Sequence, residues 1–594
     1  MKKTKFFALA FAALALGACS SDDLVEQKHP SVTPGEKGYV SVAVNLPSQP
    51  SSRANDNFDD GTAQEYNVED ATLFVFEGTS EDAAVFTGAY DLDLGNPSDV
   101  GGNITTTYQL TQEITRPENE NANVYALVTV NDNNIVTAGA SAAEGWQINN
   151  TGITAGTTTV ANVKDMIATV NVAQLANTAD EGYFFMTNAP LYTTPGGTTD
   201  PTGGNVMTLT EIDPNNIFTT EEEAEANPAA SIYVERAVAK VSVVEGENLA
   251  TAGGLATEIA GWALDMTNTK TYIVRNVDGA NWWGYASTLN PTADRYRFVG
   301  SNPVATNLYR TYWGIDPNYD GNGYTLPDEF HNAIDGIPAT LKAAGAADYC
   351  LENTFNVANQ NQNQTTRVIV AADLAVPGQE EGGDFYVINN LKDNILNKAG
   401  LDKAVKAAYL QNATVVAALQ DPTTGLDDPN TGLGEADLTV TYSSTAEGGY
   451  IDVAEVTIID ASASKFKGDV VPAILTAAGN DAIIAEINAD NSIAYYKGGR
   501  SYYPVMVKHF GDDSTPWTAG GETSYPGPNA EQNWLGRWGV LRNNWYEISV
   551  NSITEIGYPE VPEVYGTPDD PVESWISVEI NVLSWAKRTQ SADL

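Results

Sequence analysis

Short apolar runs recur along most of this chain, separated by Gly, Pro, Asn or Asp, and this pattern constrains the fold more than any other feature. Many of the runs alternate in polarity or are rich in Val, Ile, Tyr and Phe, which is typical of β-strands. The clearest runs of the first half are 38–46, 72–76, 124–130, 183–186, 232–234 and 237–244. Frequent strands joined by short turns predict an all-β protein built of β-sandwiches.

The second half of the chain mixes strand-like and helix-like segments. Ala, Leu and Lys replace the β-branched residues in three segments, so we expect helices at 337–348, 390–410 and 472–487. Strand-like patterns return at 503–507, 545–550 and 576–582. The predicted fold class is therefore all-β, with minor helices in the C-terminal half.

The N-terminus has the pattern of a lipoprotein signal. Three lysines among the first five residues precede an apolar run, 6–16, that is too short to span a bilayer. The sequence Leu16-Gly17-Ala18-Cys19 follows, with leucine and two small residues ahead of the cysteine. We therefore expect 1–18 to be a signal peptide and Cys19 to carry lipid such as palmitate. This predicts export through the periplasm, as a lipoprotein precursor, to the cell outer membrane.

Charge and composition exclude several classes of function. The 77 acidic and 30 basic residues give a formal net charge of −47, so we expect no binding of nucleic acid. The histidines are His29, His331 and His509, and the first lies in the N-terminal leader, so a shared His-based catalytic or zinc site is not expected. The sequence shows no Gly-rich phosphate loop and no nucleophile elbow. We therefore predict that the chain is not an enzyme.

A proline-bracketed loop, 47–56, contains a single arginine, Arg53. Its prolines and serines, without any large apolar residue, predict an exposed and flexible segment. A trypsin-like protease can reach such an arginine, and cleavage between Arg53 and Ala54 would release the strand at 38–46. A sandwich that has lost a strand can accept a replacement from another chain. The alternative is an ordinary surface arginine.

The last strand-like segment alternates with unusual regularity. Ile576, Val578, Ile580 and Val582 alternate with polar residues, and Trp585 follows shortly afterwards. The period matches that of 39–46, so both segments suit a similar groove. We therefore expect a donor strand near the C-terminus that acts between chains. The alternatives are that this strand closes the sheet of its own domain, or that the residues after it are the donor.

An acidic loop resembles the start of a calcium-binding loop. Asp316, Asn318, Asp320 and Asn322 supply oxygen atoms at alternate positions, and Gly321 stands at the sixth place. The closing glutamate of such a loop is missing, because Pro327 occupies its position. The loop is either a calcium site or an ordinary turn, and we expect no other cofactor.

Tryptophans leave two other functions open. Five of them, Trp282, Trp283, Trp534, Trp538 and Trp545, would suit a platform that stacks on sugars, although aromatic residues of sandwiches mostly belong to the core. A surface glycan-binding lipoprotein would use such a platform. A secreted carbohydrate-active enzyme would need a cleft with paired carboxylates.

Several segments together resemble the fimbrillin family, the type V pilus subunits. They are the lipoprotein signal, the strand at 39–46, the Arg53-Ala54 junction, 234–241, 539–546 and the terminal strand at 576–583 with Trp585. These segments span almost the whole chain, and 539–546 is fairly specific.

The resemblance implies an assembly mechanism. It implies two β-sandwich domains of transthyretin-like topology, cleavage after Arg53, and polymerisation when a neighbour's strand fills the vacated groove. With a boundary at the polar turn 245–248, the domains would be 54–246 and 247–594, preceded by a lipidated propeptide, 19–53. The expected partners are other copies of the chain, anchor and tip subunits, a trypsin-like protease and surface receptors. A shaft subunit is favoured, and a tip subunit is the alternative.

Overall fold

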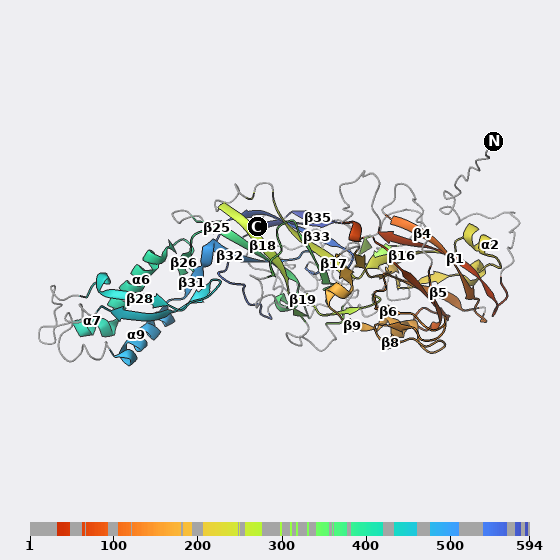
Figure 1. Cartoon of the computed structure of the whole chain (residues 1–594), viewed down its shortest axis with the longest axis horizontal. Coiled ribbons are helices and arrows are strands. Elements are labelled where there is room, and N and C mark those ends of the chain that lie inside the picture. The colour runs from red at the N-terminus through yellow and green to blue at the C-terminus, as the bar shows by residue number, and fades with distance from the viewer. Residues whose placement is uncertain are drawn as a thin grey trace, which may run out of the picture.

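Strands predominate and helices are few in the computed structural model, so the predicted all-β class is confirmed. The described residues are 32–47, 62–65, 67–92, 105–119, 121–179, 182–192, 206–246, 249, 256–275, 298–299, 309–311, 316–318, 330–331, 340–355, 359, 361–376, 382–419, 433–459, 476–509, 538–566, 576–583 and 588–591. The molecule is elongated, with the first strand towards one end and a lobe containing helices at the other (Figure 1).

The largest sheet has eight strands and holds the first strand of the chain in its interior. These strands are β1 (Lys37–Pro47), β2 (Ala71–Gly78), β3 (Val85–Asp91), β4 (Thr105–Thr115), β5 (Asn123–Val130), β12 (Met186–Asn188), β15 (Thr210–Ile212) and β16 (Ala230–Arg236). Their order is β3–β2–β5–β12–β16–β1–β4, and β15 pairs with β5 beside this path. β1 therefore lies between β16 and β4, one place in from the edge.

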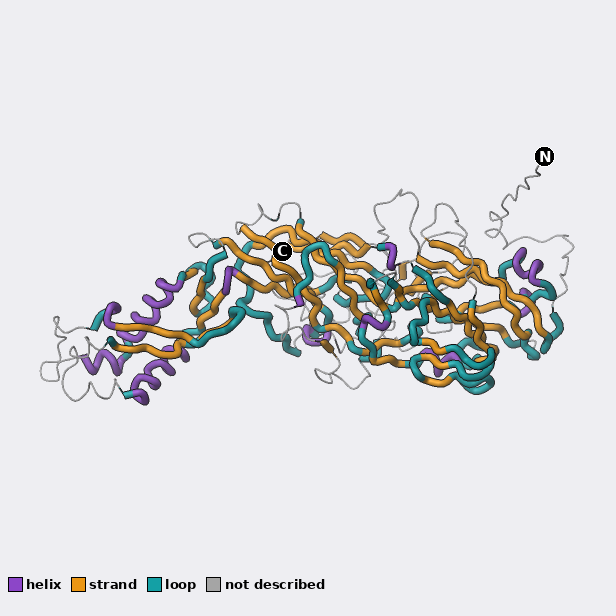
Figure 2. The backbone as a smooth tube through the Cα atoms, in the orientation of Figure 1, coloured by secondary structure: helices purple, strands orange, loops and turns teal. Residues whose placement is uncertain are grey.

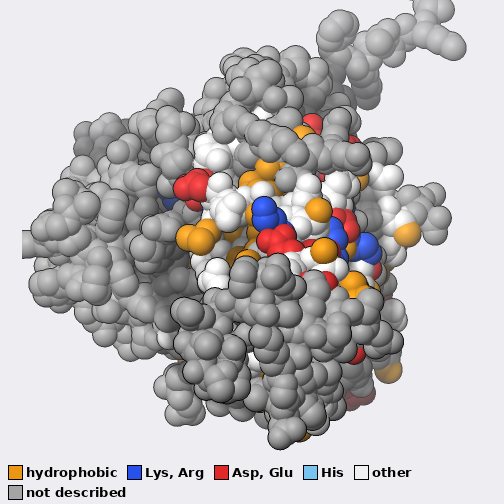
Figure 3. All heavy atoms as spheres, turned by 90° about the vertical axis from the view of Figure 1, so that its left-hand side faces the viewer, with side chains coloured by type: hydrophobic (Ala, Val, Ile, Leu, Met, Phe, Trp, Pro, Cys, Tyr) orange, Lys and Arg blue, Asp and Glu red, His pale blue; other side chains and the backbone are white. Residues whose placement is uncertain are grey.

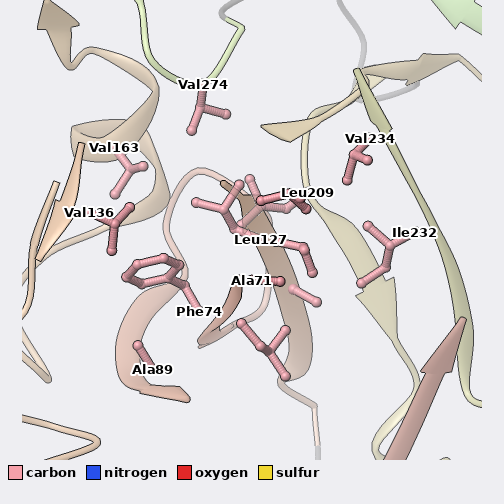
Figure 4. Packing of buried hydrophobic residues seen from close by; sticks show 14 of the residues in the cluster. Ala71, Phe74, Ala89, Leu127, Val136, Val163, Leu209, Ile232, Val234 and Val274 are labelled. Carbon is pink, nitrogen blue, oxygen red and sulfur yellow. The ribbon is translucent and has the colours of Figure 1, made fainter. Parts of the chain in front are cut away.

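Apolar side chains of this sheet pack into one hydrophobic cluster. Phe74 of β2, Leu127 of β5, and Ile232 and Val234 of β16 are fully buried in it, and Figure 4 shows them pointing into a common core. Short elements surround the cluster: β6 (Val136–Thr137), β7 (Gln147–Ile148), β8 (Thr151–Gly152), α1 (Val160–Lys164), β9 (Ile167–Thr169), β10 (Ala176–Asn177), β11 (Tyr183–Phe184), β13 (Leu191–Tyr192), β14 (Val206–Met207) and α2 (Glu221–Ala226).

Two further sheets share a second core in the middle of the molecule. One has the order β24–β17–β33–β34–β35 and the other β18–β25–β32. Their strands are β17 (Val238–Glu245), β18 (Ala256–Asp265), β24 (Ala347–Leu351), β25 (Arg367–Ala375), β32 (Arg500–Met506), β33 (Trp545–Ile553), β34 (Ile576–Leu583) and β35 (Arg588–Ser591). Val243 and Ile548 of the first sheet and Val370 and Tyr503 of the second belong to the same cluster.

Short strands link the two halves of the chain. β20 (Lys270–Tyr272) pairs with β9, and β22 (Tyr309–Thr311) pairs with β13 and with β21 (Phe298–Val299). β19 (Thr267–Asn268) pairs with β23 (Phe330–His331). Because residues of the second half pair with strands of the first, the two halves are joined by more than one connection.

A lobe with its own core is inserted between β25 and β32. It consists of β26 (Phe385–Ile388), β27 (Ile395–Leu396), α6 (Lys398–Gln411), α7 (Ala413–Leu419), β28 (Leu438–Tyr442), β29 (Gly449–Ile451), β30 (Val453–Ile458), α9 (Ala477–Asp490) and β31 (Ile493–Tyr496). Leu401, Tyr409, Val456 and Ile483 are buried in a third hydrophobic cluster. We call this insertion the distal lobe; Figure 2 shows its helices at the end of the molecule. Acidic, basic and hydrophobic side chains are mixed on this end (Figure 3).

The predicted helices have different outcomes. Helices α6 and α9 lie within or close to the predicted segments 390–410 and 472–487. Each starts at a side-chain cap, where Asn397 accepts a hydrogen bond from the Gly400 N–H and Thr476 from the Gly479 N–H. The helix predicted at 337–348 is wrong for 341–348. None of these residues is helical, and 347–351 form β24, which pairs with β17. Tertiary pairing overrides the helix propensity of this Ala-rich segment.

The change of core lies near the predicted domain boundary. Val238 belongs to the first cluster and Ala239 to the second, and β17 pairs with β24 and β33 of the C-terminal half. The packing therefore changes shortly before the predicted boundary after Gly246. The division into two transthyretin-like domains stays a prediction.

Candidate functional site

The first strand, β1, pairs along its whole length with the strand on one side. Eleven residue pairs join it to β4 in antiparallel order, from Lys37 opposite Thr115 to Pro47 opposite Thr105. On the other side, 42–45 pair with β16 in parallel order. Because a strand with two neighbours bonds through both edges, its removal would leave backbone groups unpaired on β4 and β16. We call the place between these two strands the β1 slot.

One face of β1 is apolar and buried. Val40, Val42, Val44 and Leu46 expose no more than 2% of their surface and belong to the cluster of the large sheet. At ~1.5–3 kcal/mol for each buried side chain, these four contribute roughly 6–12 kcal/mol.

The opposite face of β1 is covered by polar side chains and by α2. Ser41 is fully buried, and its hydroxyl oxygen accepts a 3.2 Å hydrogen bond from the side-chain amide of Gln109. The same amide nitrogen donates to the Glu225 carbonyl oxygen of α2 at 2.6 Å. The Ala229 N–H donates to the Ser41 carbonyl oxygen at 2.7 Å. The β1 slot is thus enclosed on both faces.

The start of β1 is held by the segment that precedes α2. Tyr39 and Phe218 exchange two backbone hydrogen bonds of 2.8 Å. A Cβ on Gly38 would lie 2.7 Å from the Phe218 carbonyl oxygen and 2.9 Å from a methyl group of Ile217. Glycine therefore allows a closer approach of the two backbones than any other residue would.

The predicted modification sites lie outside the described residues. They are the lipidation residue Cys19 and the cleavage junction of Arg53 and Ala54. β1 ends at Pro47 and the described chain resumes at Thr62, so the junction falls between these two points. Lipidation and cleavage stay predictions. Within the described parts of the chain, no helix combines the length and the apolar character needed to cross a membrane.

The chain that follows the predicted junction is fixed by a buried cluster centred on Glu65. This residue ends the short helix η1 (Ala63–Glu65), and its side chain is fully buried. A carboxylate oxygen lies 2.8 Å from the ammonium nitrogen of Lys240, which also lies 3.6 Å from the ring centre of Trp545. The guanidinium of Arg236 donates two hydrogen bonds, of 2.8 and 3.0 Å, to the Glu65 carbonyl oxygen. We call these residues, with Tyr349 and Asn543, the Glu65 cluster.

Tyr349 and Asn543 complete the Glu65 cluster. The Tyr349 hydroxyl donates to the Glu65 carboxylate, and the side-chain oxygen of Asn543 accepts from Arg236 at 3.3 Å. Burial, followed by the negative charge of Glu65, raises the pKa of Tyr349 above its usual range, so the phenol remains a donor. The two segments quoted for the resemblance, 234–241 and 539–546, therefore meet here and connect η1 to the C-terminal sheets.

The predicted donor strand is paired within its own chain. Ile576, Val578, Ile580 and Val582 lie on β34, which forms eight antiparallel pairs with β33. β35 pairs with β34 over four residues and ends this sheet. Trp585 lies outside the described residues. Within a single chain β34 thus belongs to the sheet of its own domain, as one of the alternatives expected. A role of β34 between chains stays a prediction.

The described part of the predicted calcium loop is occupied by hydrogen bonds within the protein. Asp316 and Asn318 are buried, and the other two predicted ligands lie outside the described residues. The Asp316 carboxylate accepts 2.7 Å hydrogen bonds from the Asn268 side chain and the Thr354 backbone, and two more from Asn318. Burial raises the pKa of Asp316 to about 8, against the lowering effect of the hydrogen bonds from Asn318 and Thr354. Calcium would have to displace them, and no group of three or more His, Cys, Asp or Glu among the described residues suits a metal ion.

The tryptophans that the structure describes take part in packing. Trp538 is buried, and the Lys508 ammonium lies 5.5 Å from its ring centre. Trp545 lies beneath Lys240 and donates its ring N–H to Ser242 at 2.9 Å. The other three tryptophans considered for sugar stacking lie outside the described residues.

A family model matches the C-terminal part of the chain. Residues 494–591 fit the model described as "Major fimbrial subunit protein type IV, Fimbrillin, C-terminal". The matched range includes β32, β33, β34 and β35, and with them 539–546 of the Glu65 cluster. This C-terminal part of the chain is similar to fimbrillins. No curated protein matches the sequence.

Solved structures of low similarity align with most of the chain. A fimbrilin from Porphyromonas gingivalis W83 is 14% identical with a TM-score of 0.33, over 92% of this chain and 99% of that chain. A protein of Parabacteroides distasonis ATCC 8503, provisionally described as a cell adhesion protein, is 11% identical with a TM-score of 0.33, over 93% of this chain and 98% of that chain. At such TM-scores the likeness adds no weight, so the similarity to fimbrillins rests on 494–591.

Sequence patterns singled out β1 and β34 but missed Glu65. It is one of 77 acidic residues and stands in no recognisable motif. Its partners gave the only hint in the sequence. Arg236 and Lys240 are basic residues inside a strand-like run, and a cation that is buried there requires an acidic or polar acceptor.

Proposed function

We propose that this chain is a structural subunit of a cell-surface fimbrium that supports adhesion. It is made as a lipoprotein precursor with lipid on Cys19 and is exported through the periplasm to the outer membrane. A trypsin-like protease cleaves between Arg53 and Ala54 and removes β1 with the lipid. The β1 slot then receives a strand from another copy of the chain, with anchor and tip subunits at the ends of the fibre.

One observation carries this proposal: β1 is an interior strand, although it precedes the loop that contains the arginine. It pairs with β4 and β16 and buries four apolar side chains. Losing it exposes an apolar groove with unpaired backbone groups on two strands, which strongly favours capture of a new strand. An edge strand would leave a much weaker acceptor.

The Glu65 cluster supports removal of β1 without collapse of the remaining fold. Glu65 follows the junction by a short distance and is held by Lys240, Arg236 and Tyr349. Cleavage at Arg53 leaves these contacts in the mature chain. The new N-terminus is therefore anchored within a short distance of the cut.

The number of strand pairs is compatible with exchange by β34. In its own chain β34 makes eight pairs with β33 and four with β35. The β1 slot offers eleven with β4 and four with β16. With its eight residues, β34 can use eight of the pairs with β4 and the four with β16, as many as it makes in its own sheet, so the apolar floor of the slot is what favours the exchange.

The test is assembly of an Arg53→Ala variant. We expect it to be exported and folded but to remain uncleaved and monomeric, because β1 continues to fill its slot. The matched control is Lys37→Ala, which removes a basic residue at the start of β1 and leaves the junction unchanged, and it should assemble normally. Normal surface fibres from Arg53→Ala, with β1 still attached, would refute the proposal.

A further inference from the structure

We propose that 576–582 of a second copy enters the β1 slot in one defined register, with Ile576 in the place of Val40 and Val582 in the place of Leu46. This inference rests on the proposed function and adds to it the register in which the donor strand enters the slot. It follows from a residue-by-residue likeness between β1 and β34.

The two segments have the same order of residue types. β1 contains Val40-Ser41-Val42-Ala43-Val44-Asn45-Leu46, and β34 contains Ile576-Ser577-Val578-Glu579-Ile580-Asn581-Val582. Aliphatic residues coincide at four alternate positions, and serine and asparagine coincide between them. The aromatic Tyr39 before the first segment corresponds to Trp575 before the second. A shift by two residues would lose both polar matches, and a shift by one would put polar residues on the apolar floor.

Other strands with similar runs lack this combination. β17 contains Val241-Ser242-Val243, and β33 contains Ile548-Ser549-Val550. Four positions after these serines stand Gly246 and Ile553, whereas asparagine occupies the equivalent place in both β1 and β34. Alternation alone therefore does not account for the likeness of β34 to β1.

The surroundings of β1 explain why the polar matches matter. Ser41 is fully buried and accepts a hydrogen bond from Gln109, so a serine in the same place keeps that donor satisfied. Ala43 is the one place where the segments differ in character, since β34 has Glu579 there. Ala43 exposes only 9% of its surface, but the residues paired with it, Gln109 on β4 and Ser231 on β16, are both exposed, so a longer charged side chain can extend past them to solvent.

The register can be measured by disulfide formation between two copies. Ala43 lies opposite Gln109 in the ladder, so the proposal puts Glu579 of one copy opposite Gln109 of another. Directly opposed residues have Cα atoms about 4.5–5.5 Å apart, which suits a disulfide. A shift by two residues moves the partner by roughly 7 Å and takes it out of range.

The experiment mixes single-cysteine variants after protease treatment. Gln109→Cys is combined with Glu579→Cys, and in matched controls with Ser577→Cys or Asn581→Cys. The wild-type thiol Cys350 is buried and should not react. We expect the Glu579 pair to form at least about tenfold more covalent dimer than either control, because only its Cα atoms lie in bonding range. A second pair, Thr111→Cys with Ser577→Cys, tests the same register independently, because Thr111 lies opposite Ser41.

The outcomes separate the register from the assembly mechanism. The register would be wrong if Gln109→Cys cross-linked best with Ser577→Cys or Asn581→Cys. It would also be wrong if fibres formed without either expected cross-link, from Gln109→Cys to Glu579→Cys or from Thr111→Cys to Ser577→Cys. Strand exchange itself would stand in both cases. Cleaved wild-type protein that forms no fibres would overturn the proposed function and this inference with it. Cross-links in both pairs of the proposed register, seen only after cleavage, support it.

Discussion

β1 and β34 share one pattern of apolar and polar residues, yet they lie in different surroundings. β1 has eleven pairs on one side and four on the other, in the interior of an eight-stranded sheet. β34 has eight pairs with β33 and is followed only by the short β35. The alternation of apolar and polar residues therefore defines which face of a strand is apolar. Which strands lie beside it is determined by segments that are far away in the sequence.

The largest expected effect comes from a charge in the apolar face of β1. Val42→Asp places an unpaired carboxylate among fully buried side chains and should destabilise the N-terminal sheet of the precursor by about 5 kcal/mol. Hydrogen exchange at β5 is the measurement. The matched variant Val578→Asp should leave the protection of β5 unchanged while it blocks assembly. Equal loss of protection at β5 in both variants would contradict the conclusion that β1 and β34 lie in different surroundings.

The next effect concerns the anchor that remains after cleavage. Glu65→Gln leaves the ammonium of Lys240 buried without its counter-charge and should cost about 3–5 kcal/mol in the free energy of unfolding. Chemical denaturation measures this loss. Adding Lys240→Met should recover part of it, because the unpaired charge is then gone. A loss below about 1 kcal/mol for Glu65→Gln would show that the cluster does not hold the new N-terminus.

One pH-dependent effect is expected in the N-terminal sheet. Burial raises the pKa of Asp132 from 3.8 to about 6, with the Thr72 hydroxyl donating to it at 2.5 Å. The folded state therefore keeps this proton longer than the unfolded state. The stabilisation is complete below about pH 4 and is lost as the pH rises through about 6, by up to about 3 kcal/mol. Asp132→Asn should remove the share of the slope that Asp132 contributes, and an unchanged slope in that variant would contradict the assignment.

The smallest expected effect is at the exposed start of β1. Lys37 and Glu113 form a 2.8 Å ion pair, and the hydrogen bond to Glu113 raises the pKa of the lysine. The side chains expose 70% and 41% of their surface, so Lys37→Ala should change stability only slightly, and less still in high salt. Thermal melts at two salt concentrations test this. A large loss would mean that the ends of β1, rather than its buried face, hold the strand.

Local patterns predicted the strands better than their arrangement. The run at 38–46 became β1, and the alternation at 576–582 became β34, because the period of two reflects burial of one face. The helix predicted at 337–348 failed where Ala347 and its neighbours pair with β17. The distal lobe could not be predicted, since its insertion between β25 and β32 depends on contacts between distant segments.

The candidate site was predictable only in part. The buried face of β1 follows from its alternation, but its enclosure by α2 and the hydrogen bond between Ser41 and Gln109 depend on tertiary packing. Glu65 had no local signal at all. Single buried acids are recognisable only when their cationic partners, here Lys240 and Arg236, are known to be close in space.

The most direct test of the central claim is the mass of the subunit within purified fibres. Mass spectrometry of dissociated fibres should show chains that begin at Ala54 and lack residues 37–47, because a strand from a neighbour has replaced β1. The Arg53→Ala variant, carried through the same purification, should yield no fibre. Fibres whose subunits retain 37–47 would contradict the account, since the β1 slot would then still be filled by its own strand.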